Sequence, residues 1–397
     1  MHVKKTSFET GPVLLLSFSH FVHDIYSSFL APLLPLIIEK LSISLGAAGI
    51  LSTALQLPSL LNPVIGLFAD RTNPRWFIIT APTLTAVPMS LIGLAPSYGA
   101  LLFLLSIAGL STAVYHVPAP VVVSHHSGPK IGRGMSFYMA GGEAARMLGP
   151  IIAVGFVTLF GLRNFYPIML FGLLSSVLLY VKIEDVQTAS RRKQAGSSLL
   201  APWREMKQVL LPLFGILTAK AFMHSAMAVF LSVYLTKATG NLWIGGSGLA
   251  VYEGFGIAGV LSAGSLSDRF GRKKILFLAT LCAPTATALF VLSSGFFSVL
   301  MLLLVGFSLL SVQPVMLAVI QEQARDNPAA ANGLFMMVSF AATSASTVIV
   351  GFIGDLAGLD AMYLISGALG LFALLFVFKI PDNHQGETHA GNQLGRL

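Results

Sequence analysis

The sequence predicts an all-α integral membrane protein with twelve transmembrane helices arranged as two six-helix halves. Three observations lead to this prediction. The 397 residues are 55% hydrophobic and 10% charged, with a mean hydropathy of +0.80, whereas about 25% of the residues of a soluble domain are charged. Long apolar runs separated by short polar turns recur along the chain, and a short motif repeats half a chain length apart.

The apolar runs set the number of spans, because a helix that crosses a bilayer needs about 20 mostly apolar residues. The first run is too long for a signal-peptide core, lacks a small-residue cleavage pattern and is followed by further spans, so we expect the mature protein to retain it. No sizeable soluble domain fits in the remaining residues. The predicted spans are residues 11–38, 46–69, 77–95, 99–124, 132–160, 165–181, 207–237, 243–267, 275–294, 296–322, 329–354 and 361–379.

The net charge of +8 is distributed as a membrane topology signal, and not as a nucleic-acid-binding patch. Three basic residues, Lys40, Arg163 and Lys237, fall in the loops on one predicted side, and most of the other Lys and Arg residues fall on the opposite side. The positive-inside rule then predicts a multi-pass protein of a bacterial-type inner (plasma) membrane with both termini in the cytoplasm.

The longest polar stretch, residues 183–206, divides the chain near its middle and contains the basic run 191–193. We predict an N-terminal six-helix bundle over residues 1–182, a cytoplasmic linker over 183–206, and a C-terminal six-helix bundle with a short cytoplasmic tail over 207–397. The basic run could bind anionic headgroups or simply lie in solvent.

A repeated loop supports two related halves. The segment 66–71, Gly-Leu-Phe-Ala-Asp-Arg, follows the second predicted span and is echoed 198 residues later by the segment 264–274 after the eighth. Glycine permits close helix contact, the acid can meet a helix N-terminus, and the bases remain at the cytoplasmic surface. Such a loop could act as a latch or merely cap a helix. The residues concerned are Gly66, Asp70, Arg71, Gly264, Asp268, Arg269, Gly271 and Arg272.

The second copy resembles G-x-L-x-D-R-x-G-R-K, the cytoplasmic signature loop of the major facilitator superfamily. The resemblance covers essentially the whole chain. It implies the major facilitator fold of two pseudo-symmetric bundles, a substrate site near the membrane midplane and alternating access by rocking of the halves. The first copy departs from the pattern, since residues 72–76 read Thr-Asn-Pro-Arg-Trp, so the two latches need not be equivalent.

Three short stretches resemble the fosmidomycin-resistance branch of efflux proteins. They are the Trp-containing ending of the first loop, Ser19-His20-Phe21 with Asp24 in the first span, and Tyr115-His116 in the fourth. This resemblance implies drug efflux. Val117 departs from it by separating His116 from Pro118.

Charged side chains inside spans are costly, at about 2.5–3.5 kcal/mol each near a helix centre, so their positions are informative. The third, sixth and ninth predicted spans contain no Asp, Glu, Lys, Arg or His, and in the twelfth the only such residue is Lys379 at its last position. In the superfamily these are the lipid-facing helices. The charged residues away from the ends of the other spans are Asp24, Glu143, Arg146, Lys220 and Glu253, joined by His20, His23, His116 and His224.

His20, His23 and Asp24 share one helical face because they stand at i, i+3 and i+4. An acid beside imidazoles is the arrangement that a proton relay needs. We predict proton coupling by these three residues, with Glu253 and Glu143 as further carriers. A hydrogen-bonded patch between helices and a divalent-metal site are alternatives, although no Cys or Met cluster completes the latter. No metal or other cofactor is expected, and the proton gradient would supply the energy.

Cations inside the spans suggest contacts with a negatively charged substrate. Arg146 can pair with Glu143 one turn away or bind an anion, and Lys220, which could instead snorkel to the surface, lies one turn from His224. The full set of predicted substrate contacts is Arg146, Lys220, His224, His116, Tyr115 and Gln313. We expect the pair His125-His126, near a cytoplasmic loop, to be solvated.

These features favour a secondary transporter. The sequence has no G-x-x-x-x-G-K-[ST] loop, so ATP-driven transport is not supported. The first hypothesis is proton-coupled efflux of a small anionic or amphiphilic organic compound by a monomer. The alternatives are a metabolite importer or uniporter and, less favoured, a divalent-metal transporter. A membrane enzyme or receptor lacks support, because there is no G-x-S-x-G motif or signalling domain.

Overall fold

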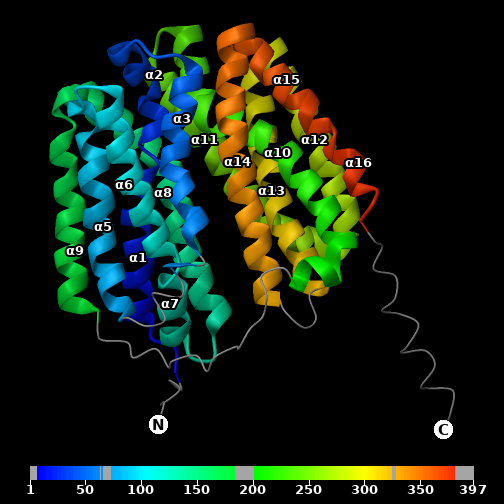
Figure 1. Cartoon of the computed structure of the whole chain (residues 1–397), viewed down its shortest axis with the longest axis horizontal. Coiled ribbons are helices and arrows are strands. Elements are labelled where there is room, and N and C mark those ends of the chain that lie inside the picture. The colour runs from blue at the N-terminus through cyan, green and yellow to red at the C-terminus, as the bar shows by residue number, and fades with distance from the viewer. Residues whose placement is uncertain (1–6, 63, 66–72, 184–200, 324–327, 381–397) are drawn as a thin grey trace.

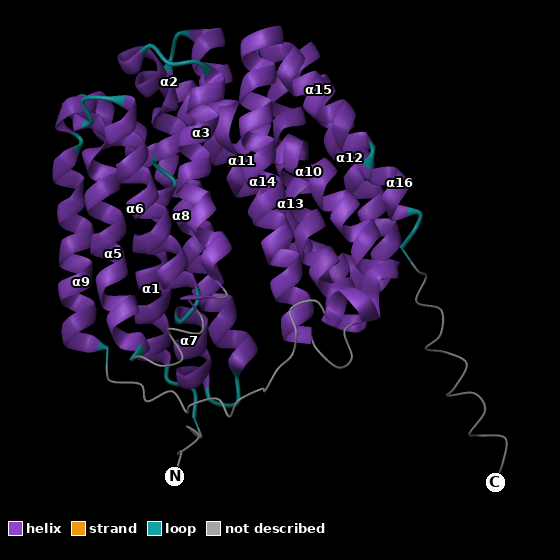
Figure 2. Ribbon diagram, viewed as in Figure 1, coloured by secondary structure: helices purple, strands orange, loops and turns teal. Residues whose placement is uncertain are grey.

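The computed structural model describes residues 7–62, 64–65, 73–183, 201–323 and 328–380. Every regular element in this part of the chain is helical (Figure 2). Eleven of the described helices are long and apolar enough to cross a membrane, and Leu45–Leu61 is a shorter apolar helix. The predicted fold class is confirmed, and each predicted span has its helical counterpart.

The first six spans are built from helices α1 to α9. Several spans are made of two consecutive helices. The elements are α1 (Thr10–Ser27), α2 (Leu30–Leu41), α3 (Leu45–Gln56), η1 (Leu57–Leu61), α5 (Pro74–Ser90), η2 (Leu91–Leu94), α6 (Tyr98–His116), α7 (Ala119–Ser127), α8 (Ile131–Phe160), η3 (Leu162–Asn164), η4 (Tyr166–Ile168) and α9 (Met169–Lys182).

The last six spans are more regular. They are α10 (Ala201–Thr239), α11 (Leu242–Phe270), α12 (Arg272–Leu292), α13 (Gly295–Gln323), α14 (Pro328–Ala357), α15 (Leu359–Leu371) and α16 (Ala373–Val377). Helix α10 begins before the predicted boundary at residue 207, with irregular backbone at Met206. Most of the predicted linker lies outside the described residues, so the domain boundaries remain a prediction.

Helices α1 to α9 form one group and α10 to α16 another (Figure 1). Contacts between the groups involve α3 with α14, α2 with α10, and α8 with α11. The two groups of ribbons lie close together at the end where α2 meets α3, which we call the closed end. They diverge toward the end where α1 begins, which we call the terminal end.

The outer helices expose apolar side chains, as a bilayer requires. Leu174 and Val181 of α9 are 68% and 69% exposed, and Leu292 of α12 is 72% exposed. In water, contiguous surfaces of this kind would drive association, so they indicate contact with lipid chains. Polar side chains therefore have to gather between the helices.

A helix break lies beside the polar residues of the fourth span. Helix α6 ends at His116, and α7 begins after Pro118. Proline has no backbone N–H, so Pro118 cannot donate the hydrogen bond that would continue α6. The break therefore places His116 at the end of a helix inside the bundle.

Candidate functional site

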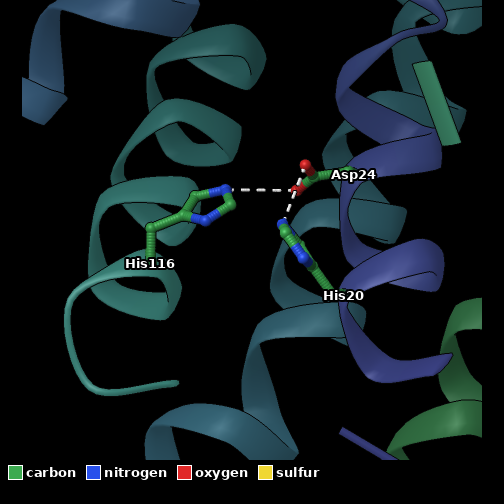
Figure 3. Close-up of side chains that lie close together, drawn as sticks. All are labelled: His20, Asp24 and His116. Carbon is green, nitrogen blue, oxygen red and sulfur yellow. Dashed lines mark ion pairs between the residues drawn. The ribbon is translucent and has the colours of Figure 1, made fainter. Parts of the chain in front are cut away.

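A carboxylate lies between two imidazoles in the N-terminal bundle (Figure 3). The Nε2 atom of His20 is 3.1 Å from Oδ2 of Asp24, and the Nε2 atom of His116 is 3.1 Å from Oδ1. His20 and Asp24 come from α1 and are buried, whereas the side chain of His116 is 34% exposed. The structure thus adds His116 to the predicted pair of His20 and Asp24.

Two glycines of α8 make room for this cluster. A Cβ atom at Gly142 would lie 2.6 Å from Cε1 of His20 and 3.1 Å from Oδ2 of Asp24, and one at Gly141 would collide with the Ser17 carbonyl. Helix α8 can approach α1 this closely only because both side chains are absent. The sequence signal was a Gly-Gly pair within a span, but its role was not predicted.

The contacts of His20 fix where its protons lie. Its Nδ1 atom is 2.7 Å from the backbone carbonyl of Tyr138, and its ring stacks on the Tyr138 ring with the centroids 4.0 Å apart. A carbonyl oxygen only accepts hydrogen bonds, so Nδ1 carries a proton. The Nε2 atom then faces Asp24 at 3.1 Å. If neither Nε2 nor the carboxyl oxygen carried a proton, their lone pairs would repel each other. One proton therefore lies between Nε2 and the carboxylate, whichever atom carries it.

His23 belongs to a separate chain of hydrogen bonds. Its Nδ1 atom is 3.1 Å from the hydroxyl of Thr85, which donates to Ser111, which in turn donates to the Ala81 carbonyl. The single hydroxyl proton of Thr85 is already donated to Ser111. The hydroxyl therefore accepts from His23, which donates through Nδ1. Its Nε2 atom is buried and has no hydrogen-bond partner among the described residues.

Tyr115 lies behind the histidines. Its side chain is fully buried, stacks on His23 with the ring centroids 4.4 Å apart, and donates a hydrogen bond to Ser19. Tyr115 is one of the substrate contacts predicted from the sequence. In this conformation the packing of its ring against His23 leaves no accessible surface for such a contact, so the substrate contact of Tyr115 stays a prediction.

Arg146 connects the two bundles. It pairs with Glu143 one turn earlier on α8, and its Nε atom lies 3.8 Å from Oε2 of Glu253 on α11. The side chain of Arg146 is 42% exposed, whereas those of both acids are largely buried. Arg146 also interacts electrostatically with Asp24, so it links the two acidic groups of the site.

The C-terminal bundle contributes a second polar group. Lys220 donates a hydrogen bond of 3.3 Å to Oε1 of Gln313 on α13, and Nδ1 of His224 lies 3.5 Å from the Tyr252 hydroxyl. Lys220 thus points to another helix and does not snorkel to the surface. Both Lys220 and Arg146 act electrostatically on His224, which places the two cations near the same imidazole.

The first signature loop, with Gly66, Asp70 and Arg71, lies outside the described residues. In the second loop, Asp268 pairs with Arg272, and the Nη2 atom of Arg272 lies 2.8 Å from Oε1 of Glu322 on α13. Gly271 ends α11 with a φ of 95°, which glycine adopts readily. Arg269 lies over the ring of Phe270. These described contacts of Asp268 and Arg272 stay within the C-terminal bundle.

The prediction of a solvated His125-His126 pair is wrong for His126. This residue is 4% exposed, and its Nδ1 atom lies 2.6 Å from Oε2 of Glu9. Glu9 directly precedes α1, and its backbone N–H also donates to the His126 carbonyl. The pair ties the start of α1 to α7 at the terminal end of the bundle.

His20, Asp24 and His116 are also donor types that bind divalent metals. One donor atom from each lies within 4.8 Å of the other two. No fourth Cys, His, Asp or Glu ligand joins this group in the described part of the chain. His23, which the sequence analysis considered for such a site, bonds to Thr85 instead.

Comparison with known proteins identifies the family. The family model of the Major Facilitator Superfamily matches residues 16–347 and 245–395. The chain belongs to the Major Facilitator Superfamily. It is 27% identical to the fosmidomycin resistance protein of Escherichia coli K12 over 387 residues, which cover 96% of this chain and 94% of that protein. The predicted resemblance to this branch is confirmed.

Two further comparisons agree with membership of the Major Facilitator Superfamily. The multidrug resistance protein MdtG of Citrobacter koseri is 25% identical over 268 residues, which cover 64% of this chain and 65% of that protein. The crystal structure of a nucleoside transporter NupG mutant superposes with a TM-score of 0.77 at 13% identity, covering 93% of this chain and 99% of that one. The protein is therefore a multi-pass membrane transporter of small molecules, and not an enzyme.

Proposed function

We propose that the protein is a proton-coupled exporter of a small anionic or amphiphilic organic compound. It acts as a monomer in a bacterial inner membrane, with both termini in the cytoplasm. The observation that carries the proposal is the contact between His20 and Asp24, whose geometry requires one proton between them. Alternating access would expose this proton to the two sides of the membrane in turn.

The surroundings of the pair suit reversible protonation. Asp24 is 8% exposed, and burial favours the neutral form of a carboxyl group while a neighbouring cation favours its charged form. His116 touches the other carboxylate oxygen from a more exposed position. A movement of α6 relative to α1 would change the charge environment of Asp24 and release or take up the proton.

The positions of two cations support an anionic substrate. Arg146 is partly exposed between the bundles, and Lys220 approaches the same region from α10. An anionic group could replace Glu253 at Arg146, since their separation of 3.8 Å is longer than a close ion-pair contact. The names of two relatives, a fosmidomycin resistance protein and a multidrug resistance protein, support efflux.

Transport in proteoliposomes tests the proposal. An imposed pH gradient should drive accumulation of fosmidomycin or a related phosphonate in wild-type vesicles, together with counterflow of protons. Asp24→Asn should remove the pH-driven transport and retain substrate binding. If the variant moves protons with substrate at the wild-type ratio, Asp24 is not the carrier. If the substrate follows only its own gradient in the wild type, the protein is a uniporter.

A further inference from the structure

The closed end is held by a contact between a carboxylate and a helix N-terminus. Oδ1 of Asp355, near the end of α14, accepts a hydrogen bond of 2.7 Å from the backbone N–H of Leu45, and Oδ2 accepts one of 2.8 Å from Gly46. Leu45 and Gly46 are the first two residues of α3. One side chain of the C-terminal bundle thus caps a helix of the N-terminal bundle.

The other bonds of the same helix turn show why this cap matters. The first four N–H groups of a helix have no partner within the helix itself. In α3, the N–H of Ala47 donates to the side chain of Ser44, and the first bond within the helix runs from Ala48 to the Ser44 carbonyl. The N–H groups of Leu45 and Gly46 precede that bond, and both donate to Asp355. The negative charge also lies at the positive end of the helix dipole, where it is stabilised.

Small residues bring α3 and α14 close enough for the cap. A Cβ atom at Gly46 would lie 2.8 Å from the Phe352 ring, and one at Gly49 would lie 2.7 Å from the Thr347 carbonyl. Further along α3, Thr53 donates a hydrogen bond of 3.1 Å to the Ser344 carbonyl. The two helices therefore pack closely over several turns, with Asp355 at the outer edge of the contact.

We propose that Asp355 is a latch that stabilises the state in which the closed end is shut. This inference rests on the alternating access of the proposed function. Opening that end must separate α14 from α3, which returns the carboxylate and both N–H groups to water. Asp355 thereby sets the ratio of the two states and takes no part in holding substrate or protons.

The acid at the terminal end makes different contacts from Asp355, as expected if Asp355 is a latch of the closed end. Asp268 of the signature loop pairs with Arg272 of its own bundle in this conformation. The acid at the closed end bridges the bundles, while the described contacts of the acid at the opposite end do not. The signature-loop latch and the Asp355 latch would be made in alternate states.

The test measures distances between spin labels by pulsed electron resonance. Labels at Arg163→Cys and Lys237→Cys, two exposed closed-end positions on opposite bundles, report the opening. Cys282→Ser removes the only native cysteine. Asp355→Asn should raise the population of long distances about three- to tenfold, and Asp355→Ala should raise it at least as much, because charged hydrogen bonds and helix-end charges contribute at this scale.

Asp360→Asn is the matched control. It removes the same charge at the same end, but Asp360 interacts with Tyr234 of its own bundle, so its distance distribution should equal that of the parent. An unchanged distribution for the folded Asp355→Ala protein would overturn the proposal. So would a fall in melting temperature with no change in distances, because the contact would then be only structural. The measurement needs neither substrate nor a proton gradient, so it is independent of the proton-coupling proposal.

Discussion

At the scale of single residues, the centre of the site is a proton whose position follows from a backbone carbonyl. The Tyr138 carbonyl fixes one proton on Nδ1 of His20, and this leaves Nε2 to share another with Asp24. In the proposed mechanism the pair therefore holds the proton as one unit, and we expect His20 to be as necessary for proton coupling as the acid. If His20 only changed the charge environment of Asp24, as any neighbouring histidine would, its Nδ1 atom would not need to be fixed by the Tyr138 carbonyl.

His20→Gln should therefore reduce pH-driven transport by more than about tenfold. The amide of Gln can donate hydrogen bonds to the carboxylate, but it cannot take up or release a proton as imidazole does. The measurement is initial transport rate under a fixed pH gradient at matched protein density. His126→Gln is the control, because His126 is also buried against an acid, Glu9, but lies at the terminal end. Equal losses in both variants would mean that His20 acts only through stability.

Gly142→Ala should disturb the contact between His20 and Asp24 while leaving both side chains unchanged. The added methyl group would lie 2.6 Å from the His20 ring, and overpacking of this kind costs about 1–3 kcal/mol. We expect about a tenfold loss of pH-driven transport from the displaced ring. Gly99→Ala, where a Cβ meets no atom within 4 Å, should transport like the wild type. Normal transport by Gly142→Ala would show that the ring position is not critical.

At the scale of elements, the site depends on which helices lie side by side. The grouping of His20 with Asp24 could be predicted, because residues at i and i+4 share a helical face. The contact of His116 with Asp24 could not be predicted, because it depends on the packing of α1 against α6 and on the break before Pro118. The buried position of Tyr115 likewise follows from tertiary packing, although its neighbour His116 points to Asp24.

The pairing of Arg146 was predicted only in part for the same reason. Its bond to Glu143 follows from helical spacing, whereas its approach to Glu253 requires α8 and α11 to pack together. The bond from Lys220 to Gln313 likewise requires α10 and α13 to pack together. Helical periodicity assigns faces, but it does not assign the neighbouring helix.

Arg146→Gln should weaken transport of an anionic compound more than that of a neutral one. Anions would lose their counter-charge, while neutral compounds would lose only polar contacts. We expect at least a fivefold difference in the loss of affinity, measured by binding of a matched anionic and neutral pair. Arg163→Gln, at an exposed closed-end position, should leave both unchanged. Equal losses for the two compounds would assign Arg146 a structural role between Glu143 and Glu253.

At the scale of the whole molecule, composition and hydropathy were sufficient to predict the fold class, because the bilayer restricts spanning segments to a few architectures. The repeat of the signature loop then indicated two related halves. The conformation could not be predicted in this way. It depends on a balance of contacts at the two ends of the molecule, and such contacts join residues hundreds of positions apart.

Asp268→Asn should slow the transport cycle and leave substrate affinity within about twofold of wild type. Asp268 lies in the signature loop, away from the residues between the bundles, and pairs with Arg272. Stopped-flow transport rates and equilibrium binding, measured on the same preparation, separate the two quantities. A weaker affinity with an unchanged rate would remove Asp268 from the latch and place it in the substrate site.

The cap on α3 has a consequence for how this protein tolerates sequence change. The acceptor is one side chain, Asp355, but the donors are main-chain groups of Leu45 and Gly46. Every amino acid except proline supplies that donor, so the contact does not depend on which side chain stands at position 45, whereas it does depend on the carboxylate at position 355. A search for pairs of positions that change together would therefore miss this contact. Leu45→Pro would break it from the other side, by deleting one donor while leaving every charge in place.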